Sequence, residues 1–534
     1  MTAMRAALVV LIASWLALVP ASAEAVGTPG CGKATPTSWN QTETWIWRKL
    51  CAGEVANLNT DPQFGARPVM SDVASWSARR TVRASFLEAV VTSRTLAAVL
   101  DSQRIIIRGA RYTEPVSLPE VHVTISIYLT QSRFEKTVDL TGAAFDKSLW
   151  FTDSYFADTI RGDSLTVEGG LHLERAHVET LDLTYASIGK HVALSDATIS
   201  THLLMGGATV GGNVALTNEN AGSFQATDLS YARIGGSLLA MGGRFGGAPD
   251  LRSAQIGENL FATGAHLPNG LVLSQANVVG FVQLSKAELE MVRAHGTTIG
   301  GTLILADSLE SPRWEKDGYL DLRGATVGSI DDNETAWPPF VLLGGFRYEL
   351  TPGDQVTVDR GSGGTEFARQ TVGWYKDWLA RDPSHPRSSY QQLEASLRSL
   401  GRNGDADKIA IFGKDQECQF STCKSRFALS TLYRYTVGYG YEPQRAIYWA
   451  LPFIGFGWIL AAARLPASPT APSALILSIQ RFIPFLSFGD AYNKVDTTSA
   501  DVDPWVRRYF YLHAIVGYVL AAFLVAALSQ LTNV

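Results

Sequence analysis

The sequence predicts a mainly β protein: a β-solenoid with an N-terminal helical cap and a C-terminal anchor of two transmembrane helices. Two observations predict the solenoid, which we place at residues 105–350. Apolar residues recur 11 residues apart over long stretches, and a small residue precedes most of them by two positions. Repeats of this kind stack, and each buries its apolar positions only against its neighbours. After the repeats, helical periodicity and two long uncharged runs predict the anchor.

The repeat indicates which side chains should be buried. The apolar anchors are Phe145, Phe156, Val167, Val178, Ile188, Ile199, Val210, Ile234, Phe245, Ile256, Leu267, Val278 and Leu289. The small residues are Ala143, Ala176, Ala186, Ala197, Ala208, Ala232, Gly243, Ala254, Ala265, Ala276, Ala287 and Ala325. No single repeat of this size could fold alone, so we expect a continuous stack.

Alternation along each strand sends the residue between two apolar positions outward. These outward residues form two interleaved series. One is mostly apolar: Ile106, Tyr128, Trp150, His172, Ala193, Ala215, Leu239, Phe261, Gln283 and Ile304. The other is mostly charged: Ser117, Asp139, Arg161, Asp182, Leu204, Asp228, Asp250, Val272, Arg293 and Asp321. We therefore expect roughly ten coils of about 22 residues with two outward strand faces, a small insertion before Leu239 and a larger one across Ser308–Leu320.

The composition excludes some partners and cofactors. The 534 residues carry 45 basic and 50 acidic side chains, and they lack the basic cluster that phosphate contacts require, so we expect no nucleic acid. The nine histidines show no metal-ligand spacing, and no dinucleotide fingerprint is present. We expect neither a metal nor a cofactor. The 48 glycines suit a solenoid with tight corners.

Residues 1–23 have the pattern of a secretory signal peptide. Arg5 precedes an apolar run from Ala6 to Pro20, and small residues lead to a cleavage site after Ala23. An uncleaved signal anchor is the alternative. Both interpretations place the solenoid outside the cytoplasm.

The four cysteines fit an oxidising compartment. Cys31 and Cys51 flank the first segment, and Cys418 and Cys423 lie close together, so two local disulfides are expected. The sequence does not prove the pairing, and buried free thiols are the alternative.

Helical segments flank the repeats. In residues 24–104, Trp45–Ala56 and Ser77–Thr92 are expected to be helices that cover the open edge of the first coil. We assign residues 351–387 to a Gly-rich linker. Residues 388–444 form a helical hairpin and a juxtamembrane segment, with Asp405 expected to cap the second helix.

Residues 445–534 form the expected membrane domain. Residues 446–463 and 509–530 are apolar and long enough to span a bilayer as helices. Residues 473–488 are interrupted by Arg481 and Pro484, so we expect this segment to lie in the interface or to re-enter. Arg464, Arg507 and Arg508 flank the intervening loop and favour a cytoplasmic location for it.

Two motifs suggest chemistry. Thr436–Gly440 reads TVGYG, the letters of a potassium channel filter, but it precedes the first expected span, so we interpret it as a turn. Asp228 and Asp250 occupy equivalent outward positions on adjacent coils, a spacing that suits a pair of glycosidase carboxylates. A solvated ladder of alternating charge is the simpler interpretation.

Nearly the whole mature chain resembles a family of bacterial membrane proteins with a pentapeptide-like solenoid and a two-helix anchor, often described as membrane-associated oxidoreductases. The resemblance lies in WSARRTVRASFLEAVV (Trp76–Val91), the repeats, LLGGFRY (Leu342–Tyr348), YQQLEASLRSLGRNGDADKIAI (Tyr390–Ile411), TVGYGYEPQRAIYW (Thr436–Trp449) and RFIPFLSFGDAY (Arg481–Tyr492). It implies a membrane-anchored solenoid of unknown activity. The chain offers no cofactor motif to match that description, and its signal peptide departs from the family.

We therefore expect a non-enzymatic inner-membrane protein that presents a periplasmic solenoid as an interaction or scaffold surface. The apolar stripe of Ala193, Ala215, Leu239, Phe261 and Ile304 is the expected contact face for a protein partner or a second copy. A carbohydrate-active enzyme that uses Asp228 and Asp250 is one alternative. A small channel or transport subunit is the other.

Overall fold

The computed structural model is a parallel β-solenoid of about 11 turns, followed by helices. It describes residues 38–93, 96, 98–100, 104–220, 222–306, 310–350, 366–420, 427–465, 471–483, 485–489, 492 and 495–531. The expected signal peptide, Cys31, Cys423 and the first part of the 351–387 linker lie outside these residues. The chain divides into two compact units, Met1–Met291 and Val292–Val534, and each is described by itself.

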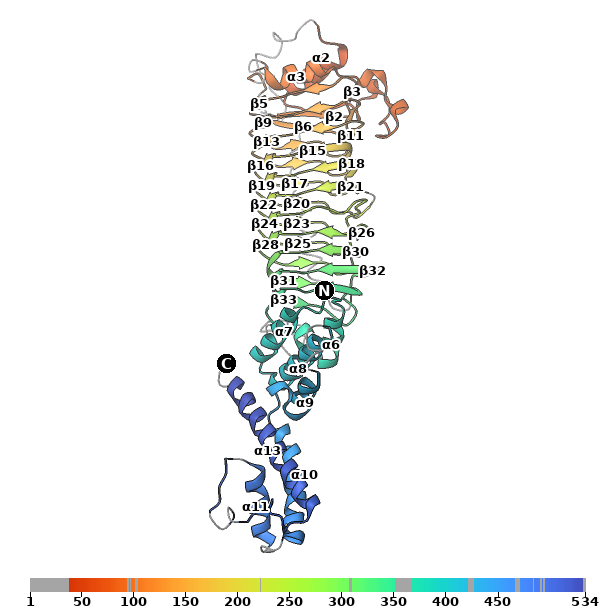
Figure 1. Ribbon diagram of the computed structural model, residues 1–534. Coiled ribbons are helices and arrows are strands. Elements are labelled where there is room, and N and C mark those ends of the chain that lie inside the picture. Colours follow the sequence, from red (N-terminus) through yellow and green to blue (C-terminus); the bar gives the residue numbers. More distant parts are fainter. Residues whose placement is uncertain are drawn as a thin grey trace, which may run out of the picture. The chain divides into compact units, whose positions relative to one another are not determined.

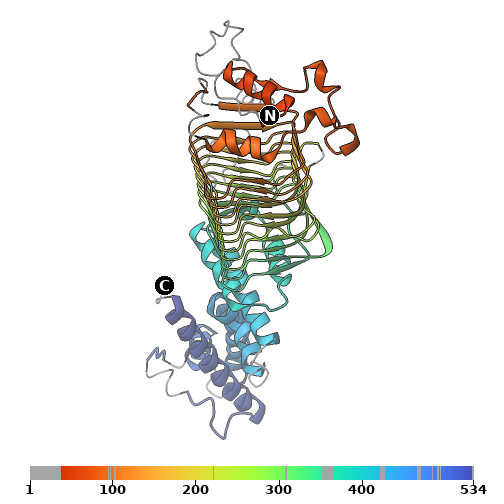
Figure 2. The same ribbon diagram turned by 90° about the horizontal axis from the view of Figure 1, so that it is seen from above.

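Strands of the first unit pair in parallel from coil to coil, and the coils superimpose along the stack (Figures 1 and 2). In one column, β9 (Ala144–Phe145), β13 (Thr166–Val167) and β16 (Ser187–Ile188) follow each other. Their partners lie 22 and 21 residues apart in the sequence, which confirms the expected coil length. The small insertion before Leu239 is confirmed as well, because Val214 pairs with Leu238, 24 residues later.

Each coil has four outward strand positions, so the expectation of two outward strand faces is wrong; in several coils one longer strand, such as β15 (His177–Asp182), covers the third and fourth positions. One coil contains β9, β10 (Leu149–Trp150), β11 (Tyr155–Phe156) and β12 (Ile160–Arg161), each two residues long. The apolar and charged series lie on the second and fourth of these faces. The residue before each anchor points outward on the other two, a position that the sequence pattern did not single out.

The corners explain why four strands fit in so few residues. A residue with left-handed backbone precedes the buried small residue at these corners, as at Gly142 (φ 65°) and Asp153 (φ 56°). The N–H of Ala143 then donates to the carbonyl of Leu140 at 3.0 Å and closes a four-residue turn. Glycine holds this position in only some coils, while Asp, Arg, Tyr or Gln holds it in others. Glycine therefore explains the corners only in part.

The core is the stack of inward side chains. None of the predicted anchors is more than 3% exposed, and the predicted alanines are buried. Aromatic anchors stack directly where they follow each other, with the rings of Phe134 and Phe156 at 4.5 Å and 2°. The sequence therefore predicted this core correctly.

The N-terminal helices pack at the first coil. α2 (Gln41–Cys51) leads into β1 (Ala56–Asn57), which pairs in parallel with β2 (Arg104–Arg108). α3 (Ala84–Thr92) begins later than the expected Ser77, because residues 78–80 form a separate 3-10 turn. β1 extends the sheet by one strand.

The second unit contains coils of its own. β31 (Thr298–Ile304) pairs with β33 (Thr326–Asp331), and β33 pairs with β35 (Arg347–Tyr348). Thr298 and its partner Thr326 are 28 residues apart, which confirms the larger insertion. Much of that insertion is the nine-residue strand β32 (Arg313–Asp321). The last strand among the described residues is β35, one strand beyond the Val341–Leu343 segment that the sequence indicated.

Helices cover the last coil through specific hydrogen bonds. α6 (Val372–Ala380), α7 (Arg387–Ser399) and α8 (Asn403–Phe420) follow the coils. Before α7, Asp382 accepts the N–H of Leu343 at 2.7 Å; from α7, the Ser389 hydroxyl donates to the Leu343 carbonyl at 3.0 Å. These side chains satisfy backbone groups that an open strand edge would leave unpaired. Asp405 does not cap α8, which begins at Asn403; it forms an ion pair with Arg402 instead.

Two of the remaining helices are long and apolar enough to cross a membrane: α10 (Arg445–Arg464) and residues 504–527 of α13 (Pro504–Leu531). The second begins earlier than residue 509 and includes Arg507 and Arg508. α9 (Phe427–Val437) precedes them, and α11 (Ala471–Phe482) packs against both. Their shared core is formed by Leu460, Ala461, Leu465, Ala474, Leu477, Val502, Val506 and Phe510.

Candidate interaction surfaces

The predicted apolar stripe is an unbroken column on one face of the first unit. Strand register places Ala193 opposite Ala215, Ala215 opposite Leu239, and Leu239 opposite Phe261. Each of these side chains is half-buried, because the coils on either side cover part of it and leave its outer surface exposed. Ile304 is half-buried on β31 of the second unit.

The same column continues into stacked rings. Tyr128 and Trp150 stack with their ring centres 5.5 Å apart, and Trp150 and His172 stack at 3.4 Å. Glu174 holds the imidazole through a 3.2 Å contact with His172 Nδ1. Burial raises the pKa of the Glu174 carboxyl, but its hydrogen bonds with His172 and Thr152 outweigh burial and leave the pKa below its usual value. This end of the column is therefore flat, aromatic and edged by a carboxylate.

A second aromatic column was missed by the sequence analysis. The guanidinium of Arg133 lies 4.4 Å from the ring centre of Tyr155, and that ring stacks on His177 at 4.4 Å. Burial and the charge of Arg133 lower the pKa of His177. These residues stand immediately before anchors, on a face that the two-face expectation left out. The available signal was that Arg133, Tyr155 and His177, which have planar side chains, precede the anchors of three successive coils.

Asp228 and Asp250 do lie opposite each other on adjacent coils. Each makes a turn contact: Asp228 Oδ1 accepts the N–H of Ser230 at 2.8 Å, and Asp250 Oδ1 accepts that of Arg252 at 3.0 Å. Asp250 also forms a 2.7 Å ion pair with Arg252. Asp139 and Asp182 make the same contact with the residue two positions later. The aspartates of this series are thus capping groups of solenoid corners.

The TVGYG segment is a turn, as expected. Residues 438–440 form a 3-10 turn between α9 and α10, and Gly438, Tyr439 and Gly440 all have positive φ. The Tyr439 hydroxyl donates to Asp415 at 3.1 Å, and Arg434 pairs with the same carboxylate at 2.7 Å. These contacts fix the entry to α10.

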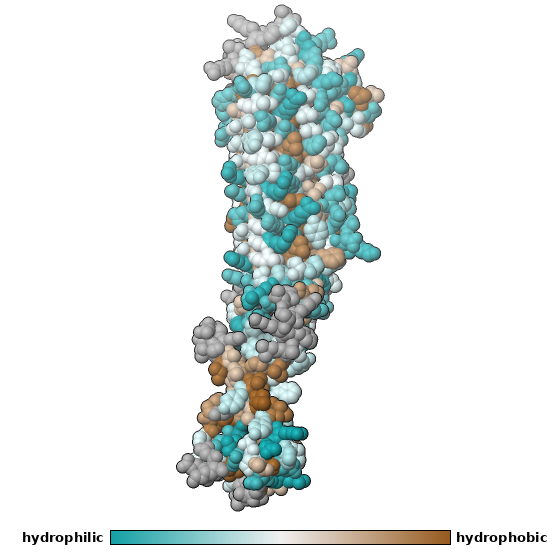
Figure 3. All heavy atoms as spheres, in the orientation of Figure 1, coloured by the Kyte–Doolittle hydropathy of each residue, from teal (hydrophilic) through white to brown (hydrophobic). Residues whose placement is uncertain are grey.

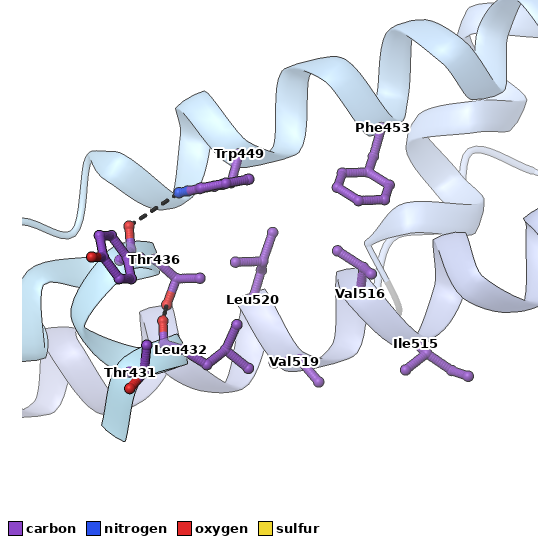
Figure 4. A pocket seen from close by; sticks show the side chains of 10 residues that line it. Thr431, Leu432, Thr436, Trp449, Phe453, Ile515, Val516, Val519 and Leu520 are labelled. Atoms are coloured by element: carbon purple, nitrogen blue, oxygen red, sulfur yellow. Dashed lines mark hydrogen bonds between the residues drawn. The ribbon is translucent and has the colours of Figure 1, made fainter. Parts of the chain in front are cut away.

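An apolar cavity of about 680 Å³ lies between α9, α10 and α13 (Figure 4). It is lined by Thr431, Leu432, Tyr435, Thr436, Trp449, Phe453, Ile515, Val516, Val519 and Leu520. Two of its polar side chains have partners within the protein: Trp449 Nε1 donates to the Tyr435 carbonyl at 3.0 Å, and the Thr436 hydroxyl donates to the Leu432 carbonyl at 2.7 Å. The cavity therefore presents hydrocarbon and aromatic surface.

A polar cavity of about 550 Å³ adjoins it, and Thr431 and Tyr435 line both. Its charged residues are Lys376, Asp415 and Arg434. The sequence analysis found neither cavity. The available signal was the helical spacing of Thr431, Arg434 and Tyr435 on α9, just before the first apolar run.

Both described cysteines, Cys51 and Cys418, are disulfide-bonded. The other two predicted disulfide residues, Cys31 and Cys423, lie outside the described residues. Within the described part of the chain, no group of three His, Cys, Asp or Glu side chains is placed to hold a metal ion.

These features define a class of protein: a parallel β-solenoid with C-terminal helices, two of which are long and apolar enough to span a membrane. Comparison of the chain with protein-family models, characterised proteins and solved structures finds no match. The solenoid is confirmed, and the resemblance to one particular membrane-anchored family stays a prediction.

Proposed function

We propose that the protein is anchored in a bacterial inner membrane and presents its solenoid in the periplasm as a non-enzymatic surface for protein contacts. The observation that carries this proposal is the column from Tyr128 to Phe261. It joins stacked rings and aliphatic side chains in one continuous strip on a rigid scaffold.

The exposure of the C-terminal helices supports the membrane anchor. Only 22% of the apolar window of α10 and 28% of that of α13 is buried, whereas the core helix of a soluble protein would be mostly buried. Large apolar side chains such as Ile447, Leu451 and Ile515 are more than half exposed. Figure 3 shows apolar side chains gathered on this helical part. Soluble monomers rarely expose so much contiguous apolar surface to water, whereas the hydrocarbon core of a membrane would cover it.

The disulfides support the location. Cys51 lies in the N-terminal helix α2, and Cys418 lies at the end of α8, before the first apolar helix. Disulfides persist in the periplasm and are rare in the cytoplasm. Oxidised cysteines in both positions agree with the expected signal peptide, because both put everything that precedes α10 outside the cytoplasm.

The column is the proposed contact face for a second copy of the chain or another protein. Interface cores are enriched in aromatic residues and depleted of charge, as this column is. We expect the double variant Leu239→Lys with Phe261→Lys to stay folded, because both side chains are only half-buried and lysine can direct its charge to water. The variant should lose the oligomer or the partner.

The measurement is crosslinking in intact cells, followed by sizing of the purified full chain. Val272→Lys is the matched control, because Val272 holds an equally half-buried outward position in the charged series. A double variant that assembles like the wild type would refute the contact face. A large fall in melting temperature would show instead that the column is covered from within.

A further inference from the structure

The two cavities beside the membrane helices are neighbours that share part of their lining. The apolar cavity runs along α10 from Trp449 to Phe453 and along α13 from Leu520 to Ile515, a depth on the order of 7 Å. The polar cavity begins where the apolar one ends, because Thr431 and Tyr435 belong to both linings. A ligand that fills both must carry a hydrocarbon chain and a polar head.

The charges of the polar cavity indicate the head. Among the described residues that line it, Lys376 and Arg434 are the cations and Asp415 is the one acid, and together they leave one net positive charge. Arg434 is paired with Asp415. Among the residues that the structure describes, Lys376 forms no ion pair, and its ammonium lies 5.2 Å from the ring centre of Phe412. One phosphodiester carries the single negative charge that would balance this site.

We propose that this site binds a membrane phospholipid, with the phosphate at Lys376 and Arg434 and the upper part of one acyl chain between Trp449, Phe453 and Leu520. The site lies at the N-terminal half of α10. The proposed topology places that half on the periplasmic side, so the lipid belongs to the outer leaflet of the inner membrane. The inference rests on the proposed membrane anchor, and it adds a specific ligand to it.

Native mass spectrometry of the delipidated full chain in detergent tests the site. The probes are palmitoyl-oleoyl-phosphatidylglycerol, a diacylglycerol of the same chains, and inorganic phosphate. We expect one tightly bound phospholipid, bound at least about tenfold more tightly than the diacylglycerol, because a hydrogen-bonded charge contributes about that factor. Inorganic phosphate should not displace it.

Three variants locate the contact. Lys376→Gln should weaken phospholipid binding about tenfold and leave diacylglycerol binding unchanged. Val516→Trp should fill the apolar cavity and reduce binding of both lipids. Lys408→Gln is the control, because Lys408 is an exposed cation outside both linings. Equal binding of both lipids, displacement by inorganic phosphate, or an unchanged Lys376→Gln variant would overturn the proposal.

Membrane fractionation of the same variants separates the two proposals. If the wild type is extracted by alkaline carbonate, the membrane anchor itself fails. If it stays in the membrane but does not discriminate between the lipids, only the lipid site fails.

Discussion

At the residue scale, the carboxyl group of Asp332 is buried next to aromatic side chains. It is 3% exposed, its Oδ2 accepts the indole N–H of Trp337, and its Oδ1 has no partner among the described residues. Trp337 in turn packs against Phe367 and Trp378. Burial raises the pKa of Asp332 to about 7, and the nearby carboxylates of Asp331 and Glu366 add to this effect.

This pKa predicts a pH dependence of stability. The folded state holds the Asp332 proton more tightly than the unfolded state, so the contribution of Asp332 to stability is fully present below the ordinary aspartate pKa and is lost as pH rises through about 7. The slope in that window is at most about 1.4 kcal/mol per pH unit from this group. Thermal unfolding of Asp332→Asn from pH 4 to pH 8 should lack this slope. Glu334→Gln, at an exposed neighbouring position, should keep it; an unchanged slope in Asp332→Asn would contradict the account.

Arg80 is the residue that joins the N-terminal segment to the first coil. Its side chain is fully buried and donates to the carbonyls of Phe64, Gly65, Ala66 and Gly109 and to the Asn59 side chain. Burial lowers the pKa of Arg80. The hydrogen bond to the Gly109 carbonyl pairs a backbone group of the first coil, and the others hold the carbonyls of the N-terminal segment against it.

We expect Arg80→Met to destabilise the protein by about 3 kcal/mol, because several buried carbonyls lose their donors while the apolar volume is kept. Arg79→Met is the matched control, since Arg79 is adjacent and exposed. Unfolding followed by tryptophan fluorescence measures both. Equal effects of the two substitutions would show that Arg80 does not tie the segments together.

At the element scale, close backbone approach holds α11 (Ala471–Phe482) against α13 and α10. A methyl group on Gly517 would overlap the carbonyl group of Phe482, and one on Gly457 would meet Ser478 and His513. Polar groups complete the contact: the Ser478 hydroxyl donates to the Ile454 carbonyl at 2.8 Å, and His513 Nε2 lies 3.0 Å from the Ser478 carbonyl. Small residues and interhelical hydrogen bonds are the usual means of packing helices in membranes.

Gly517→Ala should therefore destabilise the helical region by about 1–3 kcal/mol, as overpacking does. Gly455→Ala is the control, because a methyl group there meets nothing within 4 Å. Thermal unfolding in detergent compares the two variants with the wild type. If the Gly517→Ala and Gly455→Ala variants have the same melting temperature, α11 is not packed against α13 as described.

The membrane elements show what hydropathy predicts and what it does not. Uncharged length located both long helices, but it placed the start of α13 too late, because Arg507 and Arg508 look like a boundary while the helix continues through them to Pro504. The sequence analysis did not predict that residues 473–482 form a helix packed against α10 and α13. Its partners are single residues, such as Gly517 and His513, that leave no periodic signal.

At the scale of the whole molecule, periodicity predicted the coil length, the buried anchors and the sites of both insertions, since each follows from spacing along the chain. It missed the four-strand coil, because the corners use residues such as Asp153 and Tyr185 in left-handed conformation, and their identity does not reveal it. The stripe from Ala193 to Phe261 was predicted correctly as a column. The cavities beside α9 were missed, because three separate segments meet there.

The central claim is that the solenoid stands outside the cytoplasm on a membrane anchor, and labelling of single cysteines with a membrane-impermeant maleimide tests it most directly. Tyr185 is 70% exposed on the solenoid, and Asp501 is exposed before α13. In cells with a permeabilised outer membrane, we expect Tyr185→Cys to be labelled and Asp501→Cys to be labelled only after lysis. Labelling of Asp501→Cys but not of Tyr185→Cys in unlysed cells would contradict the claim.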